Sequence, residues 1–539
     1  MIDSTNNLNK TTINEHSIQE NIEKLFFQSG KNKNYQDILF YQDYFDIINY
    51  LIQTNTNNSN INYLTILYKL VAYTRDIKQG KGLYSLTFTQ ICVWHHFFPE
   101  LAFFMIDKII TIYGSWKDVK YLCNYVKNKY KDENHPIINY LIHFSNKQIK
   151  SDYNNFLSYN ENVISLAAKW LPREKSNLFG WIHDKLSDDY FKHKKFSQIK
   201  KTLKYRKILT VLNKEINPIE ISLCSKNNNL NFYNYSIHNI THYFNKLSQI
   251  EYKNYFETYI KNNNDFKNPY SISPFQFGKL VISVNEMNVN DEYKNILIQF
   301  IDNIWNSFLS YYSSLSNIIP FLDLSIDMHL HSNDIIYSAI SIALFIAFKS
   351  SLGKRILTTT NDKSIWINLD DTHNSFYASF NKIYKHINLD LFFNIKTSTQ
   401  DLCNCLKNHN SNNHDIKNMS LILIGSNTMQ YNSSSKFIDL EIKSIFTKNN
   451  FDYTPKLIFW NFHSGTSKIE KFNKPFTKFI SSFQWNSLAL LYDTKLNYTS
   501  NLSYSWSTFI KPLKHVKYDD IENEALIFFN KQIKNNCNL

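Results

Sequence analysis

The second half of the chain contains six short apolar runs, separated by helical or polar stretches. Continuous apolar runs are typical of strands whose sheet is covered on both faces. The runs predict strands at 318–323, 354–359, 364–369, 420–425, 456–461 and 487–492. Together with the helical patterns between them, these strands predict a doubly wound, Rossmann-like α/β domain.

Before residue 310, apolar residues recur at helical spacing instead, as in 61–74 and 101–126. The chain has only 9 Gly and 10 Pro against 36 Tyr and 41 Phe, and such a shortage of breakers favours long helices. This half is therefore predicted to be almost wholly α-helical. Its Gly-Lys-Gly at 80–82 lacks the spacing of a phosphate-binding loop and follows no predicted strand, so a turn between helices is the favoured interpretation.

A chain of 539 residues is long enough for more than one domain. We predict a disordered polar leader over 1–30, an α-helical domain over 31–314, an α/β domain over 315–500 and a C-terminal tail with a helix over 501–539. The longest apolar stretch, 335–348, is too short to span a bilayer, so no membrane insertion is expected. Because the polar N-terminus lacks the blocks of a targeting segment, we expect an intracellular, cytoplasmic protein that is not secreted.

A polar loop follows the first predicted strand, with Asp323, Ser325 and Asp327 at alternate positions. Open α/β sheets place their ligand sites at the carboxyl ends of strands. Three oxygen-bearing side chains at such a turn can hold a hard cation such as Mg²⁺. Residues 295–348 contain no Lys or Arg, so the loop has an acidic setting.

The Asp-x-Ser-x-Asp sequence at 323–327 resembles the Asp-x-Ser-x-Ser metal motif of von Willebrand factor A domains. The resemblance implies that Thr399, with Thr397 as the alternative, and Asn427 complete a degenerate metal-ion-dependent adhesion site. Asp327 stands where the family has serine, and Asn427 where it has aspartate. The resemblance is thus compatible with two alternatives, a site that binds Mg²⁺ and a degenerate site that no longer binds a metal. Sites of this family generally capture a carboxylate of a partner protein, which implies binding rather than catalysis.

A second resemblance rests on four motifs in order: YTRDIKQGKG at 73–82, YGSWKDV at 113–119, AAKWLPRE at 167–174 and YRKILTVLN at 205–213. They are similar to an uncharacterised family of giant viruses, plants and fungi. Its members join a helical-repeat (HEAT-like) module to a von Willebrand A-like domain, an architecture similar to that of the Ro ribonucleoprotein, whose helical ring binds small RNAs. A viral origin would place the protein in the host cytoplasm or the virion.

Positive charge is concentrated in the helical half. The chain has a net charge of +13, and residues 101–250 contain 23 Lys or Arg against 12 Asp or Glu. The interval between Tyr190 and Lys214 contains no acidic residue. Its basic side chains are the candidate nucleic-acid ligands: Lys192, Lys194, Lys195, Lys200, Lys201, Lys204, Arg206 and Lys207. Interleaved with Phe191, Phe196 and Tyr205, they suit contact with a phosphate backbone, the alternative being a solvated helix face.

Catalytic motifs are absent from the sequence, which has no nucleophile elbow, zinc-protease helix or kinase set. We therefore expect a protein that is not an enzyme. The first hypothesis is a binding or scaffold protein that engages protein partners through the helical module and the degenerate A-like domain. The second is a Ro-like RNA-binding protein that uses residues 192–214. A metal-dependent hydrolase, with Asp323 and Asp327 activating water through a metal, is the remote third.

Overall fold

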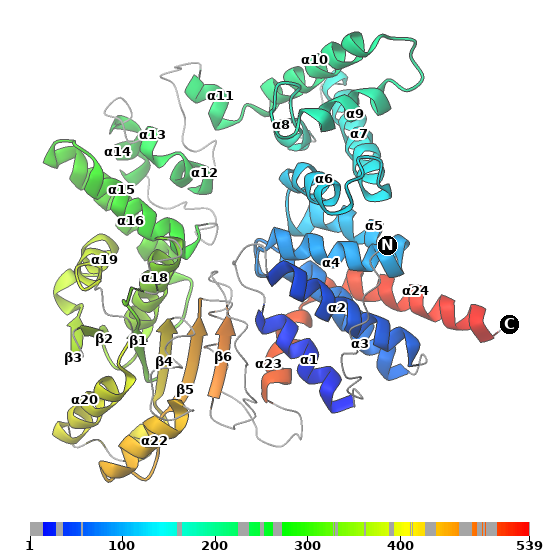
Figure 1. The fold of residues 1–539 in the computed structure, drawn as a ribbon. Coiled ribbons are helices and arrows are strands. Elements are labelled where there is room, and N and C mark those ends of the chain that lie inside the picture. The colour runs from blue at the N-terminus through cyan, green and yellow to red at the C-terminus, as the bar shows by residue number, and fades with distance from the viewer. Residues whose placement is uncertain are drawn as a thin grey trace.

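The computed structural model describes most of the chain, and the following account concerns these residues only. They are 15–28, 36–54, 58–158, 164–224, 237–247, 253–261, 272–326, 328, 333–360, 363–387, 393–409, 411, 413–425, 438–462, 477–481, 488, 491 and 504–537. The chain is mostly helical and carries a small mixed sheet, as predicted for a protein that combines α and α/β parts. Figure 1 shows the sheet beside a large group of helices.

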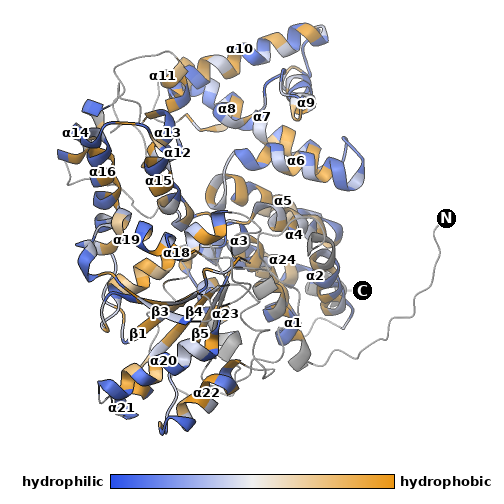
Figure 2. Cartoon of the chain, turned by 60° about the vertical axis from the view of Figure 1, so that its left-hand side comes forward, coloured by the Kyte–Doolittle hydropathy of each residue, from blue (hydrophilic) through white to orange (hydrophobic). Residues whose placement is uncertain are grey.

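The first half of the chain is helical, and its described residues between 60 and 300 contain no strand. The elements up to residue 216 are α1 (Glu15–Gln28), α2 (Gln36–Gln53), α3 (Asn58–Arg75), α4 (Tyr84–Phe97), α5 (Pro99–Lys108), the π-helical turn η1 (Ile109–Tyr113), α6 (Lys117–Tyr130), α7 (Pro136–Leu157), α8 (Ala167–Trp170), α9 (Gly180–Tyr190) and α10 (Gln198–Ile216). Hydrophobic and hydrophilic residues alternate along the outer helices, including α6 and α10 (Figure 2). This amphipathic pattern is what a helix that covers a core requires.

Helix α1 corrects the predicted leader, which was expected to be disordered over 1–30. Ile18, Ile22 and Leu25 recur at helical spacing and are buried. Phe26 packs edge-on against Phe509, with 4.9 Å between the ring centroids. The second half of the leader is therefore ordered because its apolar stripe packs against a helix that lies far away in the sequence.

The remaining elements form the sheet and the helices around it. After α10 come α11 (Ile219–Cys224), α12 (Ile237–His242), α13 (Phe244–Leu247), α14 (Lys253–Lys261), α15 (Pro274–Glu286), α16 (Asp291–Ser310), β1 (Ile318–Leu322), α18 (Asn333–Lys349), β2 (Arg355–Thr360), β3 (Lys363–Asn368), η6 (Asp370–Thr372), α19 (Phe376–Tyr384), α20 (Ile395–Asn408), α21 (Asn413–Lys417), β4 (Ser420–Gly425), α22 (Ile438–Lys448), β5 (Lys456–Asn461) and β6 (Thr477–Ser481). Two helices, α23 (Tyr504–Leu513) and α24 (Asp519–Cys537), and the turn η9 (Val516–Tyr518) between them end the described chain.

The strand order is β3-β2-β1-β4-β5-β6, in which β3 is antiparallel to β2 and the other pairs are parallel. Five predicted strands are confirmed to within one residue. The sixth was expected at 487–492, of which only Leu488 and Leu491 are described, and neither of these two lies in a strand. The edge strand of the described sheet is β6, which was not predicted, and Leu491 N donates to Leu488 O in a turn. Two leucines three residues apart fit a helical turn as well as they fit a strand, so the apolar run was ambiguous.

Alternate residues of β1, β2, β4 and β5 pack into two different cores. In β1, Leu322 joins the core under α15, α16 and α18, whereas Phe321 joins the core under α20 and α22. In β4, Ile424 joins the first of these cores and Leu423 joins the second. Because side chains alternate across a strand, a sheet covered on both faces needs apolar residues at every position. This explains the continuous apolar runs in the sequence.

The helices fall into two groups by the core they enter. Helices α1–α10 share one core with α23 and α24, and we call this group the helical part. Helices α11–α16 share a core with one face of the sheet, and with the sheet and its helices they form the sheet part. The predicted domain boundaries stay predictions, but the packing joins 219–310 to the sheet and 504–529 to the first helices. Figure 1 accordingly shows α23 and α24, in red, beside the blue N-terminal helices.

Candidate functional site

The predicted metal loop begins where β1 ends. Asp323 and Ser325 are buried, and Asp323 N donates a 2.9 Å hydrogen bond to Ile424 O of β4. Ser325 N donates to Asp323 Oδ1, also at 2.9 Å, which closes a tight turn at the strand end. The loop lies between the neighbouring strands β1 and β4. From β1 the chain adds β2 and β3 toward one edge of the sheet, and from β4 it adds β5 and β6 toward the other edge. Ligands of doubly wound sheets bind at this switch point.

The predicted threonine lies on α20. Thr399 is buried, and its Oγ1 donates to Ile395 O at 2.7 Å. The start of α20 is attached to the end of β2 by a 3.2 Å hydrogen bond from Asn394 N to Thr359 Oγ1. Thr397, the alternative, is half-buried, and its N–H donates to Asn394 Oδ1 at the helix start, so it serves as part of the cap.

A buried hydroxyl that the sequence analysis missed is that of Ser398. The Oγ atoms of Ser398 and Ser325 are both buried and make no hydrogen bond with any described residue. A buried hydroxyl without a partner costs about 1–3 kcal/mol, so such atoms suit a site that awaits a ligand. The signal was present in the Thr-Ser-Thr sequence at 397–399, but spacing alone does not tell which hydroxyl is buried.

Asp327 and Asn427, the two altered motif positions, lie outside the described residues. Within the described part of the chain, no group of three or more His, Cys, Asp and Glu side chains could hold a metal ion. The described donors are the carboxylate of Asp323 and the hydroxyls of Ser325 and Thr399. Oxygen donors of these kinds match the preference of Mg²⁺, and the binding of Mg²⁺ stays a prediction.

The predicted basic ligands lie in the turn after α9 and along α10. Two of them are ion-paired: Lys201 Nζ lies 3.0 Å from Asp188 Oδ1, and Arg206 contacts Glu174. The others are exposed, and none forms an ion pair with a described residue: Lys192, Lys194, Lys195, Lys200, Lys204 and Lys207. We call these six side chains the α10 basic surface. It is a cationic surface with few carboxylates close by.

The three aromatic residues of this segment have different roles. Lys200 and Lys204 lie over the ring of Phe196, at 4.9 Å and 4.3 Å from its centroid, and Phe191 packs edge-on against Phe196. Tyr205 corrects the prediction, because it is fully buried and donates from its hydroxyl to Asn146 Oδ1 at 2.8 Å. It follows the periodicity of the buried face of α10 and cannot contact a nucleic acid.

The motifs at 73–82 and 113–119 form a buried polar network in the helical part. Arg75 binds Asp118 with Nε and Nη2, each 2.9 Å from a carboxylate oxygen, and both residues are buried. Asp76 is also buried and accepts from Lys517 Nζ at 2.6 Å and Tyr518 OH at 2.9 Å. These residues thus hold the C-terminal segment against the first helices.

Lys81, the lysine of Gly-Lys-Gly, is buried, and its ammonium group donates to Phe26 O and lies 4.0 Å from the centroid of the Phe26 ring. Burial lowers the pKa of Lys81 to about 7. The side chain points into the protein, where it contacts α1. This agrees with a structural turn and not with a phosphate-binding loop.

Comparison with known proteins adds little to this account. Family models and curated proteins give no match. Among solved structures, the crystal structure of the Deinococcus radiodurans Ro (RSR) protein aligns with 90% of this chain and 94% of its own, with a TM-score of 0.39 and 8% sequence identity. At that TM-score we transfer neither fold nor function. The resemblance to the viral, plant and fungal family therefore stays a prediction. No described helix is both long and apolar enough to cross a membrane.

Proposed function

We propose that this protein is a non-enzymatic RNA-binding protein whose helical part contacts phosphates through the α10 basic surface. The observation that carries the proposal is the six exposed lysines that form no ion pair with any described residue, in a segment whose sequence contains no carboxylate. Cations arranged in this way attract the phosphate backbone and release its counterions on binding. This is the second of the two binding hypotheses from the sequence, and it favours a nucleic-acid partner.

Two features favour RNA contact over a merely solvated helix face. Ile199 and Leu203 are 74% and 40% exposed, one turn apart on α10. Lys200 and Lys204 follow them in sequence, and the ammonium groups of both lie over the ring of Phe196. A face that served only for solubility would place polar side chains at these positions. Apolar and aromatic groups beside cations suit a partner that has both phosphates and bases.

We further propose that the sheet part is a degenerate von Willebrand A-like domain and that the helical part is HEAT-like. The strand order and the buried Asp323–Ser325 turn at the switch point support the first of these assignments. A protein partner captured at this turn is the second candidate function, which is favoured by the Ser325 hydroxyl, because it makes no hydrogen bond with any described residue. The described residues give no support to a hydrolase.

The test is the salt dependence of RNA binding. Replacing Lys194, Lys195, Lys204 and Lys207 by Gln should weaken binding and flatten the plot of log K against log salt. The slope should fall by about 0.7 for each phosphate contact to single-stranded RNA that is lost. Lys201 is left in place because it pairs with Asp188.

The matched control replaces four exposed lysines of the sheet part by Gln, at Lys396, Lys443, Lys448 and Lys456. This control lowers the net charge by the same amount as the α10 variant. Its slope of log K against log salt should stay closer to the wild-type slope than the slope of the α10 variant does. If the two variants lose affinity and slope equally, the positive charge acts only through the net charge and the proposal is wrong.

A further inference from the structure

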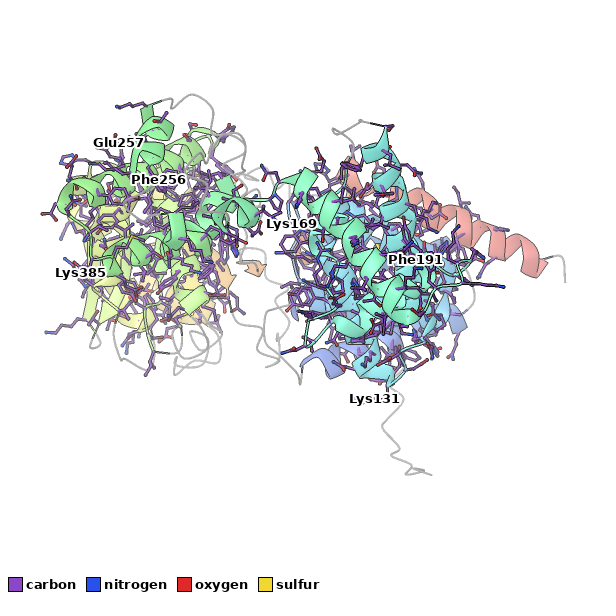
Figure 3. The ribbon with its side chains drawn as sticks, turned by 90° about the horizontal axis from the view of Figure 1, so that it is seen from above. Lys131, Lys169, Phe191, Phe256, Glu257 and Lys385 are labelled. Carbon is purple, nitrogen blue, oxygen red and sulfur yellow. The ribbon has the colours of Figure 1, made fainter. Side chains whose placement is uncertain are left out.

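A second basic and aromatic surface lies on α6 and was not predicted. Lys117, Lys120, Tyr121 and Lys127 occupy one face of α6, because residues three, four and ten positions apart lie on the same side of a helix. Lys169 and Trp170 of α8 and Phe179 of the following loop lie against this face. Figure 3 shows Lys169 on the side of the helical part that faces the sheet part.

Three lysines surround the indole of Trp170. The Nζ atoms of Lys117, Lys169 and Lys120 lie 3.9, 4.9 and 5.7 Å from the centroid of the indole ring. Every pair of these ammonium groups is therefore within about 11 Å, and because the three lysines are half-buried, salt screens their repulsion less than it screens that of fully exposed charges. Burial lowers the pKa of Lys117, and the charges of Lys120 and Lys169 lower it further.

Internal stability does not account for this cluster. The lysines and Trp170 are half-buried, a cation–π contact contributes about 0.5–2 kcal/mol between the exposed and desolvated limits, and the repulsion of three like charges opposes it. Glu220 of α11 offsets the charge of Lys169, at 3.0 Å, and itself accepts from Tyr243 OH at 2.7 Å. For Lys117 and Lys120, the structure gives no ion pair with any described residue. Such a pair of cations suits a bound anion.

Two exposed tyrosines continue this surface. Tyr84 is 50% exposed and Tyr121 is 39% exposed, and the two rings stack with their centroids 5.7 Å apart. Phe179 meets Tyr121 edge-on at 5.5 Å, and Lys120 Nζ lies 5.5 Å from the centroids of both rings. Rings and cations therefore alternate from α4 across α6 to α8, and the two tyrosines are exposed whereas the lysines, Trp170 and Phe179 are half-buried.

We propose that this surface binds single-stranded RNA, with bases stacked on Tyr84 and Tyr121 and phosphates held by Lys117 and Lys120. The assignment to RNA rests on the proposed function, whereas the preference for a single strand rests on the rings. A single strand presents the faces of its bases to aromatic side chains, and stacking contributes affinity with little regard to sequence. A duplex hides those faces inside its own stack, so its binding cannot use the tyrosines.

The experiment compares a fluorescent oligouridylate of about 16 nucleotides with an RNA duplex of the same length, by anisotropy titration. Tyr84→Leu and Tyr121→Leu keep an apolar side chain but remove the aromatic ring. Each should weaken binding of the single strand about 5- to 150-fold and leave duplex binding unchanged. Lys117→Gln with Lys120→Gln should weaken binding of the single strand and flatten its salt dependence.

The matched control is a tyrosine–lysine contact of the sheet part. Tyr453 is 46% exposed, and Lys417 Nζ lies 5.5 Å from its ring centroid. Tyr453→Leu with Lys417→Gln should leave both affinities unchanged. Circular dichroism melting of each variant confirms that it folds, which is expected because none of the changed side chains is fully buried.

The outcomes separate this inference from the proposed function. In one outcome, wild type binds RNA, the α10 lysine variant binds it more weakly, and the tyrosine variants bind the single strand as wild type does. The inference about the α6 surface is then wrong, and the proposed RNA binding stands. Equal losses for single strand and duplex in the tyrosine variants also overturn it. If wild type binds neither RNA, the proposed function fails.

Discussion

The substitution Asp118→Asn tests whether the buried Arg75–Asp118 pair holds the helical part together. The exposed fractions of the two residues are 6% and 2%, and the carboxylate also accepts from Ser115 N at 3.0 Å. Asparagine keeps the size of the side chain but removes the charge and turns an acceptor oxygen into a donor. The guanidinium group then stays buried without compensation, and removing one partner of a buried pair costs about 3–5 kcal/mol.

The magnitude is large enough to be seen in a thermal scan. For a unit of roughly 150–250 residues, each kcal/mol moves the melting temperature by about 2–4 °C, so Asp118→Asn should lower it by about 6–20 °C. Calorimetry is the suitable assay, because a chain with a helical part and a sheet part is not expected to unfold in one step. The shift should appear in the transition of the helical part.

Asp520→Asn is the matched control. Asp520 pairs with Lys108 at 3.1 Å in the same part of the protein, but its side chain is 70% exposed. An exposed pair contributes at most about 1 kcal/mol, so the control should shift the transition by no more than a few degrees. Equal shifts for the two variants would refute the idea that the buried pair matters more than a surface contact.

Two further predictions concern the buried lysine and the metal loop. Burial lowers the pKa of Lys81 to about 7, so the unfolded state binds more protons between about pH 7 and pH 10, and the contribution of this lysine to stability rises with pH across that window. The free energy of unfolding of Lys81→Met minus that of wild type, measured by urea unfolding, should therefore be more positive at pH 7 than at pH 9.5. A difference that does not change with pH would contradict this. For the loop, millimolar Mg²⁺ should raise the melting temperature of wild type above that in EDTA, but not that of Asp323→Ala. A wild-type midpoint that ignores the ion removes the metal hypothesis.

Most of the sheet was predictable from the sequence because of its burial. Strands β1, β4 and β5 have a core on each face, so their central positions are apolar, and short apolar runs are easy to find. β6 was missed because its sequence, TKFIS, mixes polar and apolar residues, and a more apolar run follows it. Edge strands carry less of this signal, since only one side of the strand is paired.

The candidate sites were predictable where they lie within one segment. The α10 basic surface follows directly from a run of lysines, and the Asp323–Ser325 turn follows from one motif. The buried position of Tyr205 could have been foreseen, because Leu209 and Leu212 share its helical face. The α6 surface could not, because it unites residues from α4, α6, α8 and the loop before α9. No spacing in the sequence records that these elements lie together.

The buried network at Asp76 bears on where the function resides. Asp76 Oδ1 accepts from the N–H groups of Lys78 and Gln79, and Oδ2 binds Lys517 and Tyr518 of the C-terminal segment. A residue that joins the beginning of the chain to its end, with every contact inside the protein, is constrained by the fold. A recognisable motif at 73–82 is therefore a structural signature. The groups that can meet a partner are the accessible ones on α6 and α10, and of their lysines only Lys117 and Lys207 lie within one of the four motifs.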